Sequence, residues 1–173
     1  MSVPVSCRYR HRRPAHTHVS ELDITFADKG DLPAVRALLR EYAAALAVSL
    51  DFQDFDREVE SLPGDYAPPG GALLVARAGG VPEGCVGLRR LDDETCEMKR
   101  LYVRPALRGL GAGRRLAAAL LDEARRRGYR RMRLDTLPGM ERAQALYEEL
   151  GFREIPPYTR NPVPGARFLE LDL

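Results

Sequence analysis

A strand, a glycine-rich loop and a helix follow one another near the middle of the chain, and this order limits the possible folds more than any other feature. The loop is Arg108-Gly109-Leu110-Gly111-Ala112-Gly113. The first turn of a helix leaves its backbone N–H groups unpaired and carries partial positive charge. Glycines allow several of these groups to point at one anion, because no Cβ atom blocks the approach. The sequence therefore predicts a pyrophosphate-binding loop, with added positive charge from Arg108, Arg114 and Arg115.

Two other phosphate-binding loops do not fit this segment. The P-loop requires Lys-Ser or Lys-Thr after its glycines, and neither pair follows here. The dinucleotide fingerprint Gly-x-Gly-x-x-Gly ends on Arg114 when read from Gly109, and on Leu116 when read from Gly111. For the glycines taken alone, a tight turn without a ligand stays open as an alternative.

Hydrophobic periodicity predicts a single mixed α/β domain over residues 21–173. Asp28 to Asp31 is typical of a turn that ends in a helix N-cap. The expected strands are 22–26, 72–78, 84–91, 95–103, 131–136, 152–155 and 168–173. The expected helices are one that follows this N-cap, with Pro33 in its first turn, and continues to Leu46, one over 52–62, one directly after the glycine loop, and one over 140–150. Short turns, one of them Gly79-Gly80, predict an antiparallel meander for the strands between 72 and 103. Strands 95–103 and 131–136 are connected through a helix, which predicts that they run parallel to each other.

The helix after the glycine loop has two faces. Its predicted buried stripe is Leu116, Ala117, Leu120, Leu121 and Ala124, and its predicted solvent face is Arg114, Arg115, Asp122, Glu123, Arg125 and Arg126. Gly128 stands where a residue that ends a helix is expected.

Length and charge exclude several classes of protein. The 173 residues fit one domain, and no apolar run approaches the roughly 20 residues of a membrane helix. Basic residues near the start are not followed by an apolar core, so we expect a cytoplasmic protein without a secretory signal. Cys7, Cys85 and Cys96 are too few and too scattered for a disulfide framework or a metal site, and we expect Cys85 and Cys96 to be buried, inert thiols. We expect residues 1–20 to be a basic, flexible segment; a nucleic-acid-binding arm is the alternative.

Three motifs in one order give the chain a family resemblance. Arg108-x-x-Gly111-x-Gly113 resembles the Arg/Gln-x-x-Gly-x-Gly/Ala signature of the GNAT superfamily of N-acetyltransferases. The segment Glu97 to Pro105 is similar to that family's fourth strand, and Ala143-x-x-Leu146-Tyr147-x-x-x-Gly151-Phe152 resembles its closing helix and strand. The resemblance implies a GNAT-like α/β fold, with a mixed, mostly antiparallel sheet of six to seven strands flanked by about four helices. One departure is Met140, which stands where relatives often carry an Asn that contacts the cofactor.

The resemblance implies transfer of an acetyl group from acetyl-CoA, the co-substrate, to a primary amine of a small molecule by direct attack in a ternary complex. No metal is expected. The edge of the strand at Leu101, Tyr102 and Val103 would pair with the pantetheine arm as an added strand does. The pyrophosphate would lie on the glycine loop. The implied loop residues are Arg108, Gly109, Leu110, Gly111, Ala112, Gly113 and Arg114.

Two side chains are candidates for catalysis through the same resemblance. Glu97 is the candidate base for the amine, and a strand carboxylate paired with Lys99, Arg89 or Arg100 is the alternative. Tyr147 is the candidate acid that protonates the CoA thiolate. Its alternative is an aromatic ring at the edge of the core, packed on Leu146 and Phe152.

The acceptor is far less defined by the sequence than the acetyl donor. We expect its site near residues 42–66 and 158–164. Asp54, Asp56, Glu58, Asp65 and Tyr66 are candidates for a cationic amine, and Tyr158, Arg160 and Asn161 are candidates for a carboxylate. A non-catalytic acyl-CoA-binding or sensing module, and acetylation of a protein amine, are the alternative functions. Neither membrane nor nucleic acid is an expected partner, and dimers are common in the family.

Overall fold

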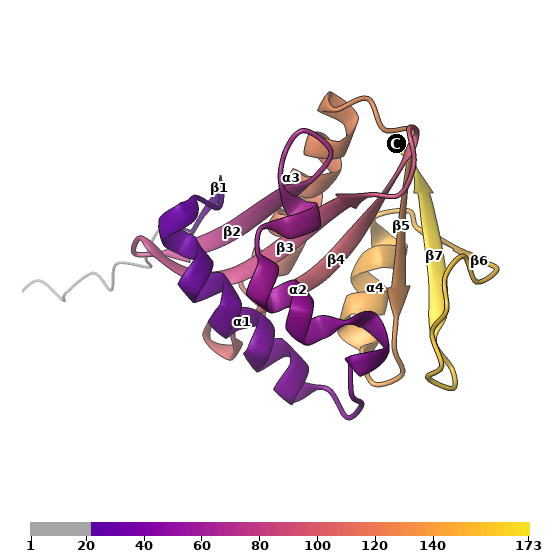
Figure 1. Cartoon of the computed structure of the whole chain (residues 1–173), viewed down its shortest axis with the longest axis horizontal. Coiled ribbons are helices and arrows are strands. Elements are labelled where there is room, and N and C mark those ends of the chain that lie inside the picture. The colour runs from indigo at the N-terminus through magenta and orange to yellow at the C-terminus, as the bar shows by residue number, and fades with distance from the viewer. Residues whose placement is uncertain (1–21) are drawn as a thin grey trace, which may run out of the picture.

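The computed structural model describes residues 22–173, which form one seven-stranded sheet with four α-helices (Figure 1). The strand order is β1-β2-β3-β4-β5-β7-β6. All neighbouring strands run antiparallel except β4 and β5, which run parallel. The predicted α/β architecture and the predicted parallel pair are therefore confirmed. The predicted basic segment 1–20, with Cys7, lies outside the described residues, and its flexibility stays a prediction.

The first half of the sheet is antiparallel and includes the predicted meander over residues 72–103. It consists of β1 (Leu22–Phe26), β2 (Ala72–Ala78), β3 (Val81–Arg90) and β4 (Thr95–Val103). Gly79 and Gly80 join β2 to β3 with φ angles of 57° and 83°, which glycine adopts without a steric cost. The tight turn lets pairing begin at Val81, so β3 starts three residues before the expected Gly84.

The first helix begins directly after the Asp28–Asp31 turn, as predicted, but its capping side chain and the start of the second helix differ from prediction. Asp28 and Asp31 form a reciprocal capping box around the 3₁₀ turn Lys29–Asp31, so the capping side chain is that of Asp28, and Asp31 itself makes no cap bond to α1 (Leu32–Ala45). The helix expected over 52–62 is divided: a 3₁₀ turn covers Asp51–Gln53, and α2 covers Phe55–Ser61. Asp54 between them has a φ of 53°, a left-handed conformation that interrupts helical hydrogen bonding.

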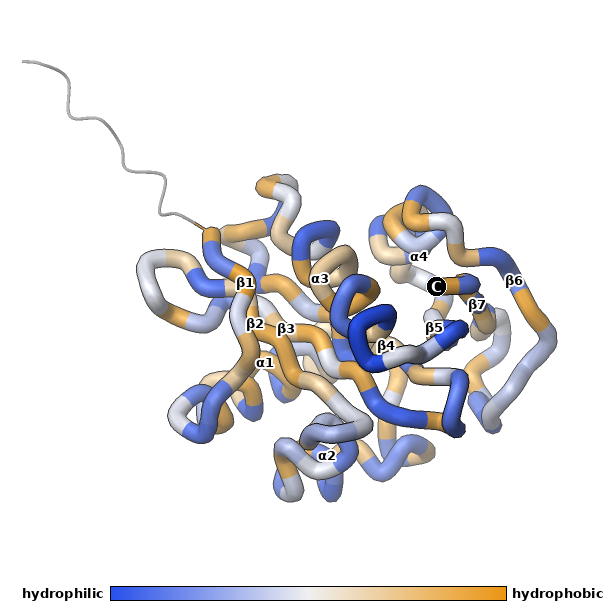
Figure 2. Tube along the Cα trace, turned by 90° about the horizontal axis from the view of Figure 1, so that it is seen from above, coloured by the Kyte–Doolittle hydropathy of each residue, from blue (hydrophilic) through white to orange (hydrophobic). Residues whose placement is uncertain are grey.

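The second half of the chain contributes two helices and the other three strands of the sheet. Its elements are α3 (Ala112–Arg126), β5 (Arg131–Thr136), α4 (Glu141–Glu149), β6 (Arg153–Ile155) and β7 (Arg167–Asp172). Helices α1 and α2 cover one face of the sheet, and α3 and α4 cover the other (Figure 1). The sheet thus has one apolar core on each face, and hydrophobic residues run along the inner strands while the peripheral turns are hydrophilic (Figure 2).

Most of the predicted pattern of α3 is confirmed, because Leu116, Ala117, Leu120, Leu121 and Ala124 are all buried. Glu123 is an exception: it was predicted on the solvent face but is only 8% exposed. Its carboxylate accepts hydrogen bonds from Arg126 and Arg127, one turn further along. These two guanidiniums provide the charge-assisted partners that a buried carboxylate requires.

The two described cysteines are buried thiols, as expected. Burial raises the pKa of both the Cys85 and the Cys96 thiol to about 12, which makes them poor nucleophiles at neutral pH. No helix among residues 22–173 combines the length and the hydrophobicity needed to cross a membrane.

Candidate active site

The centre of the sheet opens between its two parallel strands. β4 and β5 are paired only where Thr95–Glu97 lie beside Arg131–Arg133. Both strands continue, β4 to Val103 and β5 to Thr136, without further pairing between them. The β5-facing backbone edge of β4 is therefore unpaired beyond Glu97. This edge includes Leu101, Tyr102 and Val103, the residues expected to pair with the pantetheine arm.

A β-bulge in β4 contributes to this opening. β3 advances by two residues from Cys85 to Gly87, while β4 moves by three from Tyr102 to Lys99, so β4 carries one extra residue. Arg100, inside the bulge, has a φ of 60°. The bulge places two consecutive side chains on the α2 face, since Lys99 and Arg100 both contact Gln53.

The glycine loop lies directly beyond this open edge. Gly109 and Gly111 have φ angles of 80° and 78°, and a Cβ atom at either position would meet no other atom within 4 Å. These glycines are therefore required for backbone conformation and not for packing. Within the described chain, the N–H of Leu110 donates to the Leu107 carbonyl, whereas the N–H groups of residues 111–114 donate to no protein group.

Arginines accompany these free N–H groups. The Arg108 Nε donates to the carbonyl oxygen of Val103 at 3.0 Å, and its guanidinium lies 5.7 Å from the centroid of the Tyr102 ring. Arg108 thus ties the loop to the end of β4 by a hydrogen bond and a cation–π contact. Arg114 is exposed and pairs with Glu149 of α4. The helix start therefore presents four free donors, with positive charge beside them, to an anionic group.

Tyr147 lies where the open edge of β4 meets α4. Its ring packs edge-on against Phe152, with centroids 5.8 Å apart, and the residue is 6% exposed. Its hydroxyl makes no hydrogen bond within residues 22–173, and the residue borders a cavity of about 30 Å³ between β4 and β5, together with Tyr42, Leu101 and Met140. Burial raises the pKa of the Tyr147 phenol, so it stays protonated at neutral pH, as an acid must.

Glu97 is fully buried and both of its carboxylate oxygens are engaged. Oε2 accepts a bond from Arg89 Nε, and Oε1 accepts one from the Tyr158 hydroxyl at 2.7 Å. Of the two interpretations of Glu97, the ion pair is favoured, because Glu97 contacts Arg89 and Tyr158 and is not among the residues that border the cavity beside Tyr147. The proposed role as base is untested.

A second polar cluster lies in the opening between β4 and β5, around Asp135. The Asp135 carboxylate accepts bonds from Lys99 Nζ at 3.3 Å, Gln53 Nε2 at 3.2 Å and Asn161 Nδ2 at 2.8 Å. The side chains of Lys99 and Asp135 are 7% and 6% exposed. Gln53, Lys99 and Asp135 border the same cavity as Tyr147. This cluster brings together residues from four separate segments of the chain.

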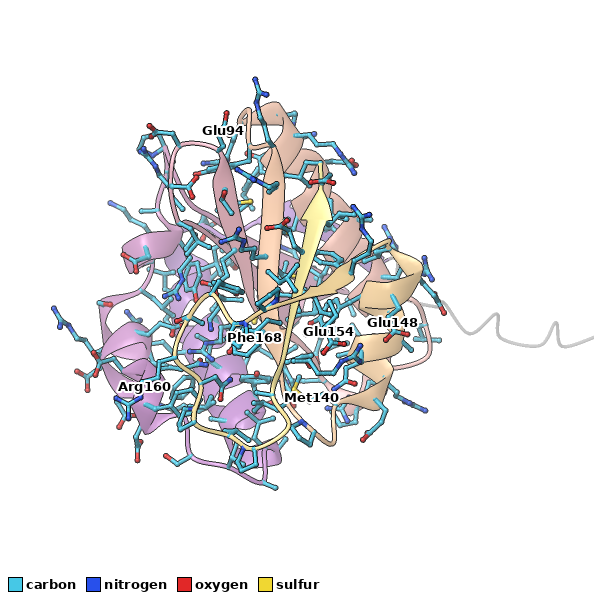
Figure 3. All side chains as sticks on the ribbon, turned by 90° about the vertical axis from the view of Figure 1, so that its right-hand side faces the viewer. Glu94, Met140, Glu148, Glu154, Arg160 and Phe168 are labelled. Atoms are coloured by element: carbon cyan, nitrogen blue, oxygen red, sulfur yellow. The ribbon has the colours of Figure 1, made fainter. Side chains whose placement is uncertain are left out.

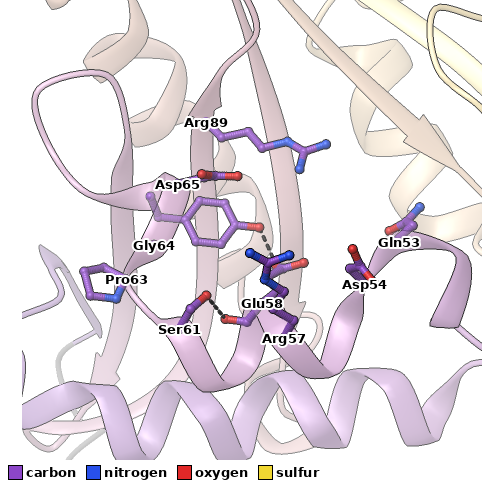
Figure 4. Close-up of a pocket in the computed structure, with 10 residues that line it drawn as sticks. Gln53, Asp54, Arg57, Glu58, Ser61, Pro63, Gly64, Asp65 and Arg89 are labelled. Atoms are coloured by element: carbon purple, nitrogen blue, oxygen red, sulfur yellow. Dashed lines mark hydrogen bonds between the residues drawn. The ribbon is translucent and has the colours of Figure 1, made fainter.

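Next to this cluster, on the α2 side, lies a polar pocket of about 370 Å³ (Figure 4). Arg100 forms a bidentate ion pair with Glu58, and the Tyr66 hydroxyl donates to the same carboxylate at 2.6 Å. Gln53 borders both this pocket and the cavity beside Tyr147. Figure 4 shows Arg89 extending from β3 over the pocket; its Nε is bound to Glu97.

The acceptor residues expected from the sequence fall into two groups. Asp54, Glu58, Asp65 and Tyr66 border the polar pocket. Asp56 and Arg160 are exposed, and Arg160 stands on the outer part of the segment between β6 and β7 (Figure 3). Tyr158 and Asn161, by contrast, are bound to Glu97 and Asp135, so they position these carboxylates.

Sequence reasoning did not identify Gln53 or Asp135, and it considered Lys99 only as a partner of Glu97. The only local signal was a carboxylate at the last but one position of a strand whose residues alternate between half-buried and buried. That signal becomes informative only when the neighbouring strand diverges, which no periodicity reveals.

Comparison with known proteins gives one consistent result. Residues 33–152 match the model of the acetyltransferase (GNAT) family. An uncharacterized N-acetyltransferase of Schizosaccharomyces pombe is 38% identical over 145 residues, which cover 83% of this chain and 89% of the relative. The uncharacterized N-acetyltransferase YjgM of Escherichia coli is 32% identical over 130 residues, which cover 72% of this chain and 78% of the relative.

A solved structure extends the similarity to a protein with a bound ligand. The yncA protein of Salmonella typhimurium, solved with its cofactor acetyl-CoA, superposes with a TM-score of 0.66 and is 27% identical. The match covers 88% of this chain and 94% of that one.

Proposed function

Because the chain belongs to the GNAT family of N-acetyltransferases, we propose that it transfers the acetyl group of acetyl-CoA to a primary amine of a small molecule by direct attack in a ternary complex. The observation that carries this proposal is the opening between β4 and β5. At one end it meets the free N–H groups of the glycine loop, and at its centre it meets the Tyr147 hydroxyl.

The residues present fit acetyl-CoA. The four free N–H groups of residues 111–114 and the nearby arginines suit a pyrophosphate, which is the anion that a helix start with no side-chain cap can hold. The unpaired edge at Leu101 to Val103 suits the amide groups of pantetheine, which can bond to it as a further strand would. Met140 replaces the family's Asn contact, and its side chain borders the cavity beside Tyr147.

Two protein groups would act on the reacting atoms. A backbone N–H on the Leu101–Tyr102 segment would donate to the oxygen that becomes negative during attack. The Tyr147 hydroxyl, which has no protein partner and a raised pKa, would supply the proton that the departing thiolate takes up. Holding the amine and the thioester together in this opening would provide much of the remaining rate.

A small acceptor is supported by the shape of the α2 side. Next to the cavity beside Tyr147 lies the polar pocket of about 370 Å³, which is lined by α2, the segments on either side of it, and Arg89 of β3 (Figure 4). A pocket of this volume suits a small molecule.

A turnover assay tests the proposal. Wild-type protein is incubated with acetyl-CoA and a panel of alkylamines, arylamines, amino acids and amine-bearing antibiotics, and the released CoA thiol is measured. We expect amine-dependent release with at least one acceptor and none without an amine. Tight acetyl-CoA binding without release for any amine would refute the proposal and support the non-catalytic module.

A further inference from the structure

Asp135 has a buried carboxylate and borders the cavity beside Tyr147, and neither acetyl-CoA binding nor the proposed acid role of Tyr147 requires it. It lies on β5, two residues after Arg133, where pairing with β4 ends. Asp135 and Tyr147 border the same cavity of about 30 Å³, between two strands that have separated. A cavity of this size holds a group as small as an amine or a water molecule.

The contacts of Asp135 leave one position on its carboxylate open. Oδ2 accepts two hydrogen bonds, from Gln53 and Asn161, while Oδ1 accepts only one, from Lys99. Each oxygen of a carboxylate can accept about two bonds. Asn161 is itself fixed, because its Oδ1 accepts the backbone N–H of Val163. Asp135 is thus held in place through Oδ2, and its Oδ1 can accept one more hydrogen bond.

Lys99 already shows what kind of group this carboxylate binds. Its ammonium contacts Asp135 at 3.3 Å, longer than the 2.8 Å of the Asn161 contact. Burial lowers the pKa of Lys99, and the negative charge of Asp135 opposes that change. A second ammonium at this carboxylate would be a like charge next to Lys99, and one of the two cations would then lose a proton readily.

We propose that Asp135 receives the ammonium group of the acceptor on Oδ1, takes up the proton that must leave before attack, and thereby selects alkylamines as acceptors. This inference rests on the proposed acetyltransferase function and names the residue that contacts its acceptor. Glu97 does not border this cavity and binds Arg89 and Tyr158 instead.

The acceptor R–NH₃⁺ gives one proton to Oδ1 of Asp135, and its free electron pair forms the N–C bond to the acetyl carbonyl carbon. The C–S bond then breaks, Tyr147 gives its proton to the sulfur, and the nitrogen returns a proton to Tyr147. Asp135 passes its proton to solvent, so one proton is released for each amide formed.

The surroundings support a polar alkylamine. Gln53 borders both the cavity and the pocket of about 370 Å³, so an acceptor whose amine reaches Asp135 would extend past Gln53 toward that pocket. Asp54, Arg57 and Asp65 border the pocket, and its lining is mainly polar (Figure 4). An apolar arylamine would gain little from such a lining.

The first test uses wild-type protein alone. Cyclohexylamine and aniline are similar in size, but at neutral pH the first is a cation and the second is uncharged. We expect CoA release with alkylamines, and at least tenfold higher kcat/KM for the better alkylamines of the panel than for any arylamine. Arylamines used as well as alkylamines would overturn the inference while leaving acetyl transfer intact.

The second test uses Asp135→Asn, which keeps the shape of the side chain, and Asp122→Asn as the control. Asp122 lies on the exposed side of α3. We expect Asp135→Asn to lower kcat/KM for the best alkylamine by about 100-fold or more, the range of a lost proton acceptor, with acetyl-CoA affinity unchanged by calorimetry. Asp122→Asn should match wild type.

Two outcomes of this test would overturn the inference. Unchanged activity of Asp135→Asn would show that the amine does not use this carboxylate. An equal loss of acetyl-CoA affinity would assign Asp135 a purely structural role. If Asp135→Asn does not fold, the wild-type selectivity decides, and an absence of CoA release for every amine in wild type would refute the proposed function itself.

Discussion

Gly111 and Gly113 stand two residues apart at the start of α3, and they should respond in opposite ways to replacement by alanine. Gly111 is the residue before α3 and has a φ of 78°, a conformation that non-glycine residues rarely adopt. Gly113 lies within the first turn of the helix and has no positive φ. Both are small residues in the same loop, so each variant serves as the control for the other.

The structure sets the size of each effect. A Cβ at Gly111 would meet nothing within 4 Å, so the cost of Gly111→Ala is conformational and amounts to about 1–2 kcal/mol. A Cβ at Gly113 would lie 3.9 Å from Val103 Cγ2 and 4.0 Å from Leu146 Cδ2, which is ordinary van der Waals contact. Alanine in a helix is favoured over glycine by up to about 1 kcal/mol, so Gly113→Ala should be neutral or stabilising.

The strain of Gly111→Ala can appear in either of two measurements. If the loop keeps its conformation, the free energy of unfolding falls. If the loop relaxes, the N–H groups turn away and acetyl-CoA affinity falls instead, by about 5–30-fold for the same 1–2 kcal/mol. Denaturant unfolding and calorimetric titration with acetyl-CoA together measure the sum of the two losses.

Two results would refute this reasoning. One is a Gly111→Ala protein that equals wild type in both measurements, because the φ of 78° would then not be required. The other is a Gly113→Ala protein that loses as much affinity as Gly111→Ala, because the effect would then be steric and not conformational.

Three further predictions concern single side chains. Tyr147→Phe should lower kcat by about 100-fold. Acetyl-CoA affinity and stability should not change, since the hydroxyl has no protein partner among the described residues. Turnover assays that measure released CoA thiol check this prediction, and full activity would exclude the acid role. Glu97→Gln should lower the free energy of unfolding by about 3 kcal/mol because it breaks a buried ion pair with Arg89, but it should leave the pH profile of kcat/KM in place; a lost ionisation in that profile would identify Glu97 as the base instead. The hydrogen bond from Arg77 lowers the pKa of Asp31, so this carboxylate stabilises the fold at pH values above its ordinary pKa of about 4, and that contribution is lost as the pH falls through the lowered folded-state pKa. Asp31→Asn should therefore cost about 1.5–3 kcal/mol at pH 7, and denaturant unfolding should find the gap to wild type closing in acid; a gap that does not depend on pH would contradict the assignment.

Much of the fold could be read from local patterns. β4 and β5 have the predicted bounds, and the buried stripe of α3 is the predicted one, because alternation and helical spacing report which side of an element faces the core. Errors occurred where a neighbouring side chain decided the outcome. Glu123 is buried only because two arginines of its own helix neutralise it, and periodicity assigns every charged residue to the solvent face.

The sequence by itself determined the donor side of this protein. A glycine loop between a strand and a helix is contiguous, so its residues, their order and their spacing are all visible in the chain. Together with the strand before it and the closing helix, it predicted the family that the match over residues 33–152 confirms. Location in the cytoplasm and the behaviour of residues 1–20 stay predictions.

Only the tertiary structure decided how the proposed acceptor side is assembled. Asp135 meets Gln53 across 82 positions of the chain, Lys99 across 36 and Asn161 across 26. Their meeting depends on a bulge in β4 and on the divergence of β4 from β5, both of which result from packing between distant segments. The loop that dominates the sequence therefore predicts where the acetyl donor binds, while the carboxylate proposed to choose the acceptor becomes visible only once the sheet is formed.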